Sequence, residues 1–244
     1  MKFFLMMLMS VLVLNCSSSS QDAGQQTDSV QPEQKKAERT YDIDPEILEQ
    51  PGQPVPPDQI VPPLQAIKDL DKTIEQYQLG SDLTPEQVEQ NKELKRKIIR
   101  GTFDIRELCR LSLGSHWETL AQKQRDYFVS LMTRLLETKA IFSKEQLRGG
   151  DKLYTINYNK ETLDNNEKTK STVYTQMYVP KEKMNLDITY KLLKTPYGWK
   201  IFDVIVDEAS LLSNYKVQFH RIIDKNGFDD LVGRMEKKLK DISK

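Results

Sequence analysis

The two histidines are the first residues to consider, because imidazole often acts as an acid, a base or a metal ligand near neutral pH. His116 and His220 lie far apart in the sequence, and neither belongs to an HExxH, GxSxG or CxxC motif. We expect His116, beside Trp117, to form hydrogen bonds at a helix end and His220 to be a solvated helix residue. The sequence therefore predicts no metal site.

A second group with chemical potential is the carboxylate set Asp203, Asp207 and Glu208. Two carboxylates could act as a general acid and base, but capping of the helix that follows is the simpler interpretation. Lys170-Ser171-Thr172 resembles the end of a phosphate-binding loop but lacks the preceding glycines that would cradle a phosphate. The sequence thus favours a protein that is not an enzyme and has no cofactor.

The charges of the chain cancel, with 36 Lys and Arg against 36 Asp and Glu in 244 residues. A nucleic-acid partner usually requires a basic surface, so none is expected. The two cysteines, Cys16 and Cys109, do not make a disulfide framework, and Cys109 is interpreted as a small buried apolar residue.

The N-terminus has the features of an export signal. Lys2 precedes an apolar run over residues 3–14, which is shorter than the roughly 20 residues that span a bilayer. The run ends in Val13-Leu14-Asn15-Cys16 before a serine tract, which resembles a relaxed bacterial lipoprotein signal. We expect residues 1–15 to be the signal peptide and a lipid on Cys16 to anchor the chain. Ordinary cleavage to a soluble protein is the alternative.

Residues 16–60 are rich in Ser, Gln and Pro and are predicted to be a disordered tether, because they cannot bury enough apolar surface to offset the entropy of ordering. Beyond residue 60 the apolar spacing changes to that of helices and strands. Thr84 with Gln87, and Asp104, are the expected helix caps. Helices are predicted over residues 64–79, 84–101, 104–113, 119–140 and 209–223, and from residue 228 onward.

Strands are predicted over residues 153–158, 171–179, 186–193 and 199–206, and their short connections make the sheet antiparallel. The predicted fold class is α+β, with an antiparallel sheet of at least four strands packed against N- and C-terminal helices. In the last strand, alternation predicts two apolar faces and hence a central strand. One face holds Trp199, Ile201 and Ile205, and the other holds Phe202, Val204 and Val206. Periodicity alone does not distinguish a filled core from a lined cavity.

Two stretches carry a resemblance to a known family. The first runs from Phe103-Asp104-Ile105 through Gly114-Ser115-His116-Trp117 to Phe128, and the second from Gly198-Trp199-Lys200-Ile201 through Ser210-Leu211 to Gln218-Phe219. In order and spacing they resemble the MlaC, or toluene-tolerance, family of periplasmic phospholipid-binding proteins, over roughly residues 62–242. The family has glycine and valine before the serine that matches Ser210, whereas this chain has Glu208-Ala209.

The resemblance implies a partly NTF2-like domain over residues 61–244, with an apolar pocket for the acyl chains of a bound phospholipid. The implied partners are an inner-membrane ABC transporter with an MCE-domain subunit and an outer-membrane lipoprotein or porin complex. The residues expected to contact lipid are Phe103, Leu111, Trp117, Phe128, Leu131, Leu135, Val173, Thr175, Met177, Ile188, Tyr190, Leu192, Phe202 and Val204.

The leading hypothesis is therefore a carrier that exchanges phospholipid between the inner and outer membranes, located in the periplasm or cell envelope. The alternative is an envelope lipoprotein that acts as an interaction module, with a filled NTF2-like core. A third option is an NTF2-like enzyme that uses Asp203 as a base.

Overall fold

The computed structural model describes residues 40–49, 52–78, 80, 82–139, 154–164 and 166–242. Two short helices come first, α2 (Pro45–Leu48) and the 3-10 helix η2 (Pro57–Gln59), followed by α3 (Pro63–Ile74) and α4 (Pro85–Thr102). Three helices lead to the sheet: α5 (Ile105–Leu113), α6 (Ser115–Thr119) and α7 (Gln122–Lys139). Two more follow it, α8 (Leu211–Asn226) and α9 (Phe228–Ile242).

The sheet contains β1 (Thr155–Leu163), β2 (Lys170–Val179), β3 (Met184–Thr195), β4 (Gly198–Val206) and the two-residue β5 (Ala209–Ser210). Its strand order is β1-β2-β3-β4-β5, and every neighbouring pair is antiparallel. The 3-10 helix η3 (Pro180–Glu182) connects β2 to β3. The predicted α+β class with an antiparallel sheet is confirmed.

The helix starts follow local chemistry. The Gln87 N–H donates to the Thr84 hydroxyl at 3.3 Å, and the Thr84 N–H donates to Gln87 Oε1 at 2.8 Å, so the predicted capping box begins α4. Asp104 accepts from the Glu107 N–H at 2.9 Å and caps α5 as expected. These caps set the residue at which each helix begins.

A β-bulge corrects the predicted faces of β4. Lys191 pairs with Asp203 and Leu192 pairs with Ile201, which leaves Phe202 as an extra residue in the ladder. The inserted residue reverses the alternation, so Trp199, Ile201, Val204 and Val206 all belong to one buried cluster. The prediction that Val204 and Val206 face away from Trp199 and Ile201 was therefore wrong.

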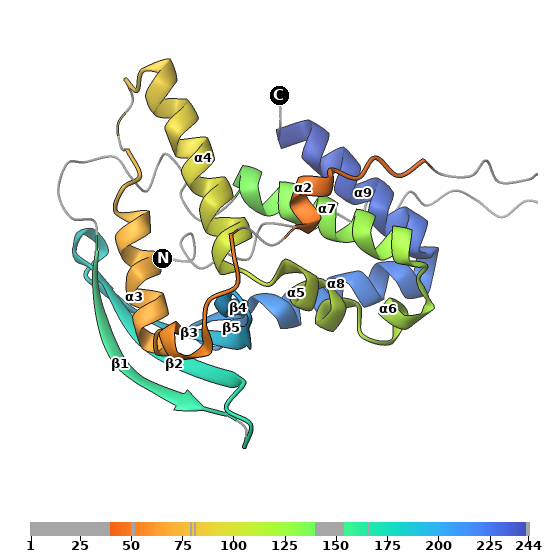
Figure 1. Cartoon of the computed structure of the whole chain (residues 1–244). Helices are drawn as coiled ribbons and strands as arrows, with labels where there is room; N and C mark the ends of the chain where they lie inside the picture. The colour runs from red at the N-terminus through yellow and green to blue at the C-terminus, as the bar shows by residue number, and fades with distance from the viewer. Residues whose placement is uncertain are drawn as a thin grey trace, which may run out of the picture.

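Buried apolar side chains form two clusters. The helical cluster lies among α4 to α9 and contains Ile99, Ile105, Leu108, Cys109, Leu113, Trp117, Tyr127, Phe128, Val129, Leu131, Met132, Leu135, Leu136, Leu211, Tyr215, Phe219, Ile222, Leu231, Val232 and Met235. The sheet cluster lies between the sheet and helices α3 and α4, and contains Ile67, Leu70, Ile98, Val173, Leu186, Ile188, Tyr190, Leu192, Trp199, Ile201, Val204 and Val206. Phe103 packs against both clusters. Figure 1 shows the same division, with the curved sheet and α3 at one end and helices α5 to α9 at the other.

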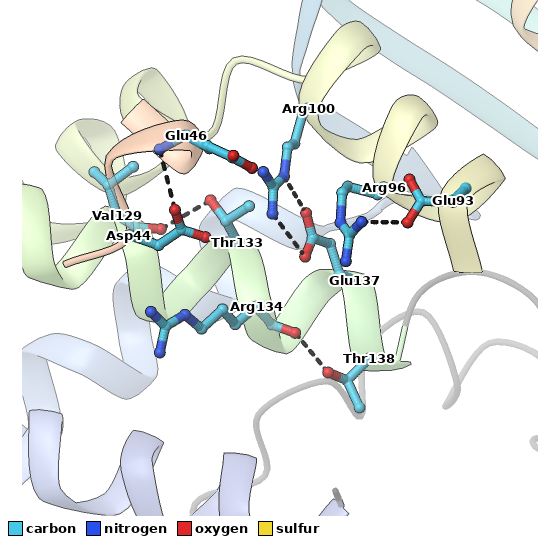
Figure 2. Close-up of polar contacts among 10 residues, drawn as sticks. All are labelled: Asp44, Glu46, Glu93, Arg96, Arg100, Val129, Thr133, Arg134, Glu137 and Thr138. Carbon is cyan, nitrogen blue, oxygen red and sulfur yellow. Dashed lines mark hydrogen bonds and ion pairs between the residues drawn. The ribbon is translucent and has the colours of Figure 1, made fainter. Parts of the chain in front are cut away.

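An ion pair connects the sheet end of the molecule to the helical end. Arg100, at the end of α4, donates from Nε to Glu137 Oε1 of α7 at 2.6 Å, and its second contact to Oε2 is 3.4 Å (Figure 2). Both side chains are largely buried, with exposed fractions of 13% and 16%. Such a two-point contact fixes the direction of α4 relative to α7.

The N-terminal segment differs from the expectation of a tether that extends to residue 60. Ile47 of α2 is buried, and the ring of Tyr41 lies 5.0 Å from that of Tyr127 in α7. Residues 40–49 and 52–60 therefore lie against the domain, because a few apolar side chains in a polar segment are enough to dock it. Residues 1–39, which include the predicted signal peptide and Cys16, are outside the described residues.

Candidate functional site

Helix α3 lies across the concave face of the sheet, as Figure 1 shows. Its residues Ile67 and Leu70 are buried against the sheet cluster, while Lys68 and Lys72 remain at the surface. Ile67 and Leu70 are three positions apart and therefore lie on one face of the helix. Apolar residues at this spacing are the reason why the sequence predicted a helix here. Helix α3 thus closes one side of an apolar space whose other side is the sheet.

A cavity of about 330 Å³ lies beside α3. Its walls come from α3, from the end of α4, from the turn between β3 and β4, and from residues 55–61. The lining residues are Val55, Gln59, Ile60, Val61, Ala66, Ile67, Asp69, Leu70, Thr73, Gly101, Thr102, Leu192, Tyr197, Gly198, Trp199 and Ile201. The volume is at the lower end of ligand pockets, which span about 300–1,000 Å³.

One wall of the cavity is a segment that we call the strap, residues 52–62. The Val55 N–H donates to the Pro196 carbonyl at 2.8 Å, which ties the strap to the β3–β4 turn. The Gln59 N–H donates to the Pro56 carbonyl at 2.9 Å and closes η2. The strap therefore forms one wall of the cavity, with proline-rich backbone that makes few hydrogen bonds of its own.

Polar groups hold the other side of α3. The Tyr158 hydroxyl of β1 donates to Asp71 Oδ2 at 2.5 Å, and the Leu64 N–H donates to Glu161 Oε2 at 2.5 Å. Burial raises the pKa of Asp71 to about 6, although the hydrogen bond from Tyr158 partly opposes the shift. Burial also raises the pKa of Tyr158. Helix α3 is thus attached to β1 by a carboxyl group that titrates in mildly acidic solution.

The structure brings together about half of the residues expected to contact lipid. Val173, Ile188, Tyr190, Leu192 and Val204 belong to the sheet cluster, and Phe103 and Met177 pack against it. Thr175 is buried and donates to the Ile188 carbonyl at 3.1 Å. Of the predicted set, Leu192 lines the cavity itself.

The remaining predicted residues lie elsewhere. Trp117, Phe128, Leu131 and Leu135 are buried in the helical cluster. Leu111 and Phe202 are half-buried and are members of neither cluster. These six therefore do not face the cavity beside α3.

Several lining residues were missed by the sequence analysis. Leu70 could have been identified from the helical spacing of apolar residues in α3. Trp199 and Ile201 could have been identified from their alternation in β4. Val55 and Ile60 carried no such signal, since the proline-rich composition around them is typical of a linker.

Both carboxylate oxygens of Asp203 accept hydrogen bonds at the start of α8. Its Oδ2 accepts from the Ser210 hydroxyl at 2.7 Å, and its Oδ1 accepts from the Leu212 N–H at 2.9 Å. Ser210 in turn accepts from the Ser213 N–H at 2.9 Å. These contacts hold the start of α8, so the prediction that Asp203 serves helix capping is confirmed.

Within the described ranges, no helix combines the length and the apolar character needed to cross a bilayer.

A protein-family model described as "MlaC protein" matches residues 68–237. Among solved structures, a phospholipid-binding protein from Ralstonia solanacearum, determined in complex with a phospholipid at 1.53 Å, is similar to this chain with a TM-score of 0.53 and 21% identity. The alignment covers 74% of this chain and 96% of that chain, so the fold is shared. No curated protein matches the chain significantly.

Proposed function

The chain belongs to the MlaC family, and on that premise we propose that it binds phospholipid and carries it between the inner and outer membranes. It would act as the substrate-binding component of an ABC-type lipid transport system. The observation that carries the proposal is the cavity between α3, the strap and the sheet, whose walls include Leu70, Leu192 and Ile201. The solved structure with the same fold is that of a phospholipid-binding protein in complex with a phospholipid.

The energetics favour acyl chains as the occupant. Each CH₂ group moved from water into such a site contributes about 0.8 kcal/mol, so the tails of a phospholipid supply a large gross gain. Most of that gain replaces burial that the bilayer already provides, and therefore exchange with a membrane is near balance. The phospholipid headgroup is expected to stay outside, where it needs no charged partner.

The cavity size has a consequence for the mechanism. A cavity of about 330 Å³ is small for a phospholipid with two chains. Lipid entry therefore requires the strap, α3 or both to move away from the sheet. The sheet cluster then provides the apolar surface that the acyl chains would contact.

The proposed partners are an inner-membrane ABC transporter with an MCE-domain subunit and an outer-membrane lipoprotein or porin complex. The proposed location is the periplasm or cell envelope, with a lipid on Cys16 as the anchor. Incorporation of a labelled fatty acid into the chain, and its loss in Cys16→Ser, would test the anchor directly. Equal labelling of the two chains would exclude Cys16 as the site.

Mass spectrometry of lipids extracted from the purified full chain tests the proposed function. We expect phospholipid at close to one molecule per chain, above the amount in an unrelated lipoprotein purified in the same detergent. Equal phospholipid in the two samples across several preparations would contradict the proposal and favour the alternative, an interaction module of the envelope with a filled core.

A further inference from the structure

The two histidines of the chain meet in the structure. His116 lies in α6 and His220 in α8, and their ring centroids are 4.8 Å apart with the rings nearly perpendicular. The sequence analysis treated them as unrelated residues because many elements separate them. It also overlooked Asp224, which stands four residues after His220 and therefore on the same side of α8.

Asp224 completes a group of three metal-ligating side chains. Its Oδ1 lies 3.1 Å from His116 Nε2. One donor atom from each of His116, His220 and Asp224 lies within 4.8 Å of the other two. His116 of α6 is thus brought next to His220 and Asp224 of α8.

The backbone makes room for this arrangement at Gly114. Its φ is +55°, and a Cβ at this position would lie 3.2 Å from His220 Nε2. A glycine therefore permits both the turn between α5 and α6 and the close approach of the imidazole. The exposed Lys216 is the neighbouring cation, and its flexible side chain can turn toward solvent.

His220 has an unexplained polar atom. Its Nε2 is buried and has no hydrogen-bond partner in the part of the chain that the structure describes. The contact between His116 Nε2 and Asp224 Oδ1 does not involve His220. Buried polar atoms without a partner are rare and call for an explanation, and a bound ion is one of the accepted causes.

We propose that His116, His220 and Asp224 bind a divalent transition metal of the zinc class. Two imidazole nitrogens and a carboxylate oxygen are a typical zinc donor set, whereas Mg²⁺ and Ca²⁺ prefer oxygen ligands. Ligands at about 2.0–2.1 Å from a tetrahedral ion lie about 3.3 Å from each other, close to the 3.1 Å between His116 and Asp224. Small side-chain rotations would bring His220 within bonding distance of the ion, and a water molecule would occupy the fourth coordination position.

The site is open to solvent and distinct from the cavity. The side chain of Asp224 is 65% exposed and that of His116 is 24% exposed, so an ion can enter from outside. The bound ion would clamp α6 to α8 within the helical part, at the opposite end of the molecule from α3 (Figure 1). Metal binding and lipid binding can therefore be tested separately.

Titration of the purified full chain with Zn²⁺, followed by calorimetry and by thermal unfolding, tests the proposal. We expect one Zn²⁺ per chain and a rise in the unfolding temperature, since a ligand that binds the folded state stabilises it. His116→Gln and His220→Gln should each weaken binding at least about tenfold, the minimum loss that even an outer-shell change produces. Mg²⁺ should leave the unfolding temperature unchanged.

The exposed Asp224 provides a variant that should fold normally, and Asp224→Asn should also weaken Zn²⁺ binding. Asp82→Asn is the matched control, because Asp82 is an exposed carboxylate before α4 and does not belong to the group of His116, His220 and Asp224. Absence of stoichiometric Zn²⁺ binding would overturn the proposal. So would binding that is equally tight in Asp224→Asn, Asp82→Asn and the unchanged chain.

Discussion

The backbone N–H of Val55 donates a hydrogen bond of 2.8 Å to the carbonyl oxygen of Pro196, and this contact fastens the strap to the β3–β4 turn at the edge of the cavity. Val55 also lines the cavity, together with Tyr197 and Gly198 from the same turn. The contact therefore connects a segment outside the matched family region, which begins at residue 68, to the site where lipid is proposed to bind.

Replacing Val55 by proline should loosen the strap, because proline has no N–H to donate to Pro196. Loss of one such bond is expected to cost about 1 kcal/mol of strap docking, which corresponds to a roughly fivefold faster opening of the cavity. The measurement is the rate at which fluorescent phospholipid passes between the protein and vesicles. Val55→Ala keeps the N–H and is the control; identical rates for the two variants would show that this hydrogen bond does not limit exchange.

A large side chain in place of Gly101 should fill the cavity and displace lipid. Gly101 lines the cavity, and a Cβ built there has no atom within 4 Å. Gly101→Phe is expected to remove most of the co-purifying phospholipid, whereas Gly101→Ala should stabilise α4 by about 1 kcal/mol and retain lipid. Lipid content is measured by mass spectrometry and stability by urea unfolding.

The matched control is Gly233→Phe in α9, where a Cβ also meets open space but the cavity is absent. This variant should keep its phospholipid. Equal lipid content in Gly101→Phe and Gly233→Phe would place the lipid somewhere other than beside α3.

Asp71 should make stability depend on pH in a definite direction. Burial raises the pKa of its carboxyl group from 3.8 to about 6, so the folded chain holds a proton that the unfolded chain has released. The carboxyl group therefore stabilises the fold below pH 4, and this contribution is lost as the pH rises through about 6. A shift of this size corresponds to about 3 kcal/mol.

The comparison is with Asp71→Asn, which cannot ionise but can still accept the hydrogen bond from Tyr158. Urea unfolding at pH 4 and pH 7 should show the unchanged chain losing about 2 kcal/mol relative to the variant. Parallel pH profiles for the two chains would mean that Asp71 titrates normally.

Glu208 occupies a position that suits glycine. Ile205 pairs with Ser210 and Val206 with Ala209, so Asp207 and Glu208 form a two-residue turn, and their φ angles are +45° and +70°. An L-residue in this region is strained by about 1–2 kcal/mol, so Glu208→Gly should stabilise the chain by about 1 kcal/mol after the extra entropy of the unfolded glycine is subtracted. Glu208→Ala keeps the Cβ and should bring no such gain. If the alanine variant were as stable as the glycine variant in urea, left-handed strain would not be the cause.

Local chemistry made most of the fold predictable. The capping box of Thr84 with Gln87 and the cap at Asp104 act within a few residues, and helices α4 and α5 begin where these signals stand. The Glu208-Ala209 departure from the family pattern is also local, and the structure explains it as a tight turn built without glycine.

What the sequence did not predict depends on contacts between distant residues. The bulge at Phe202 reverses the faces of β4, and nothing in the alternation marks an inserted residue. The strap was interpreted as part of a tether because its docking relies on a backbone hydrogen bond to Pro196 and a few apolar side chains. The cavity could not be predicted for the same reason. Periodicity identifies which faces are buried, but tertiary packing sets the volume that is left between them.

The route of the strap also determines how the domain would respond to mechanical force. The chain passes from α2, docked on α7, along the strap to α3. A pull applied at the N-terminal end would load these contacts one after another: first Tyr41 and Ile47, then the bond from Val55 to Pro196, and only afterwards α3. Peeling of this kind would uncover the cavity while the sheet and the helical cluster remain folded. Tension along the N-terminal segment would therefore act on one wall of the cavity in which lipid is proposed to bind.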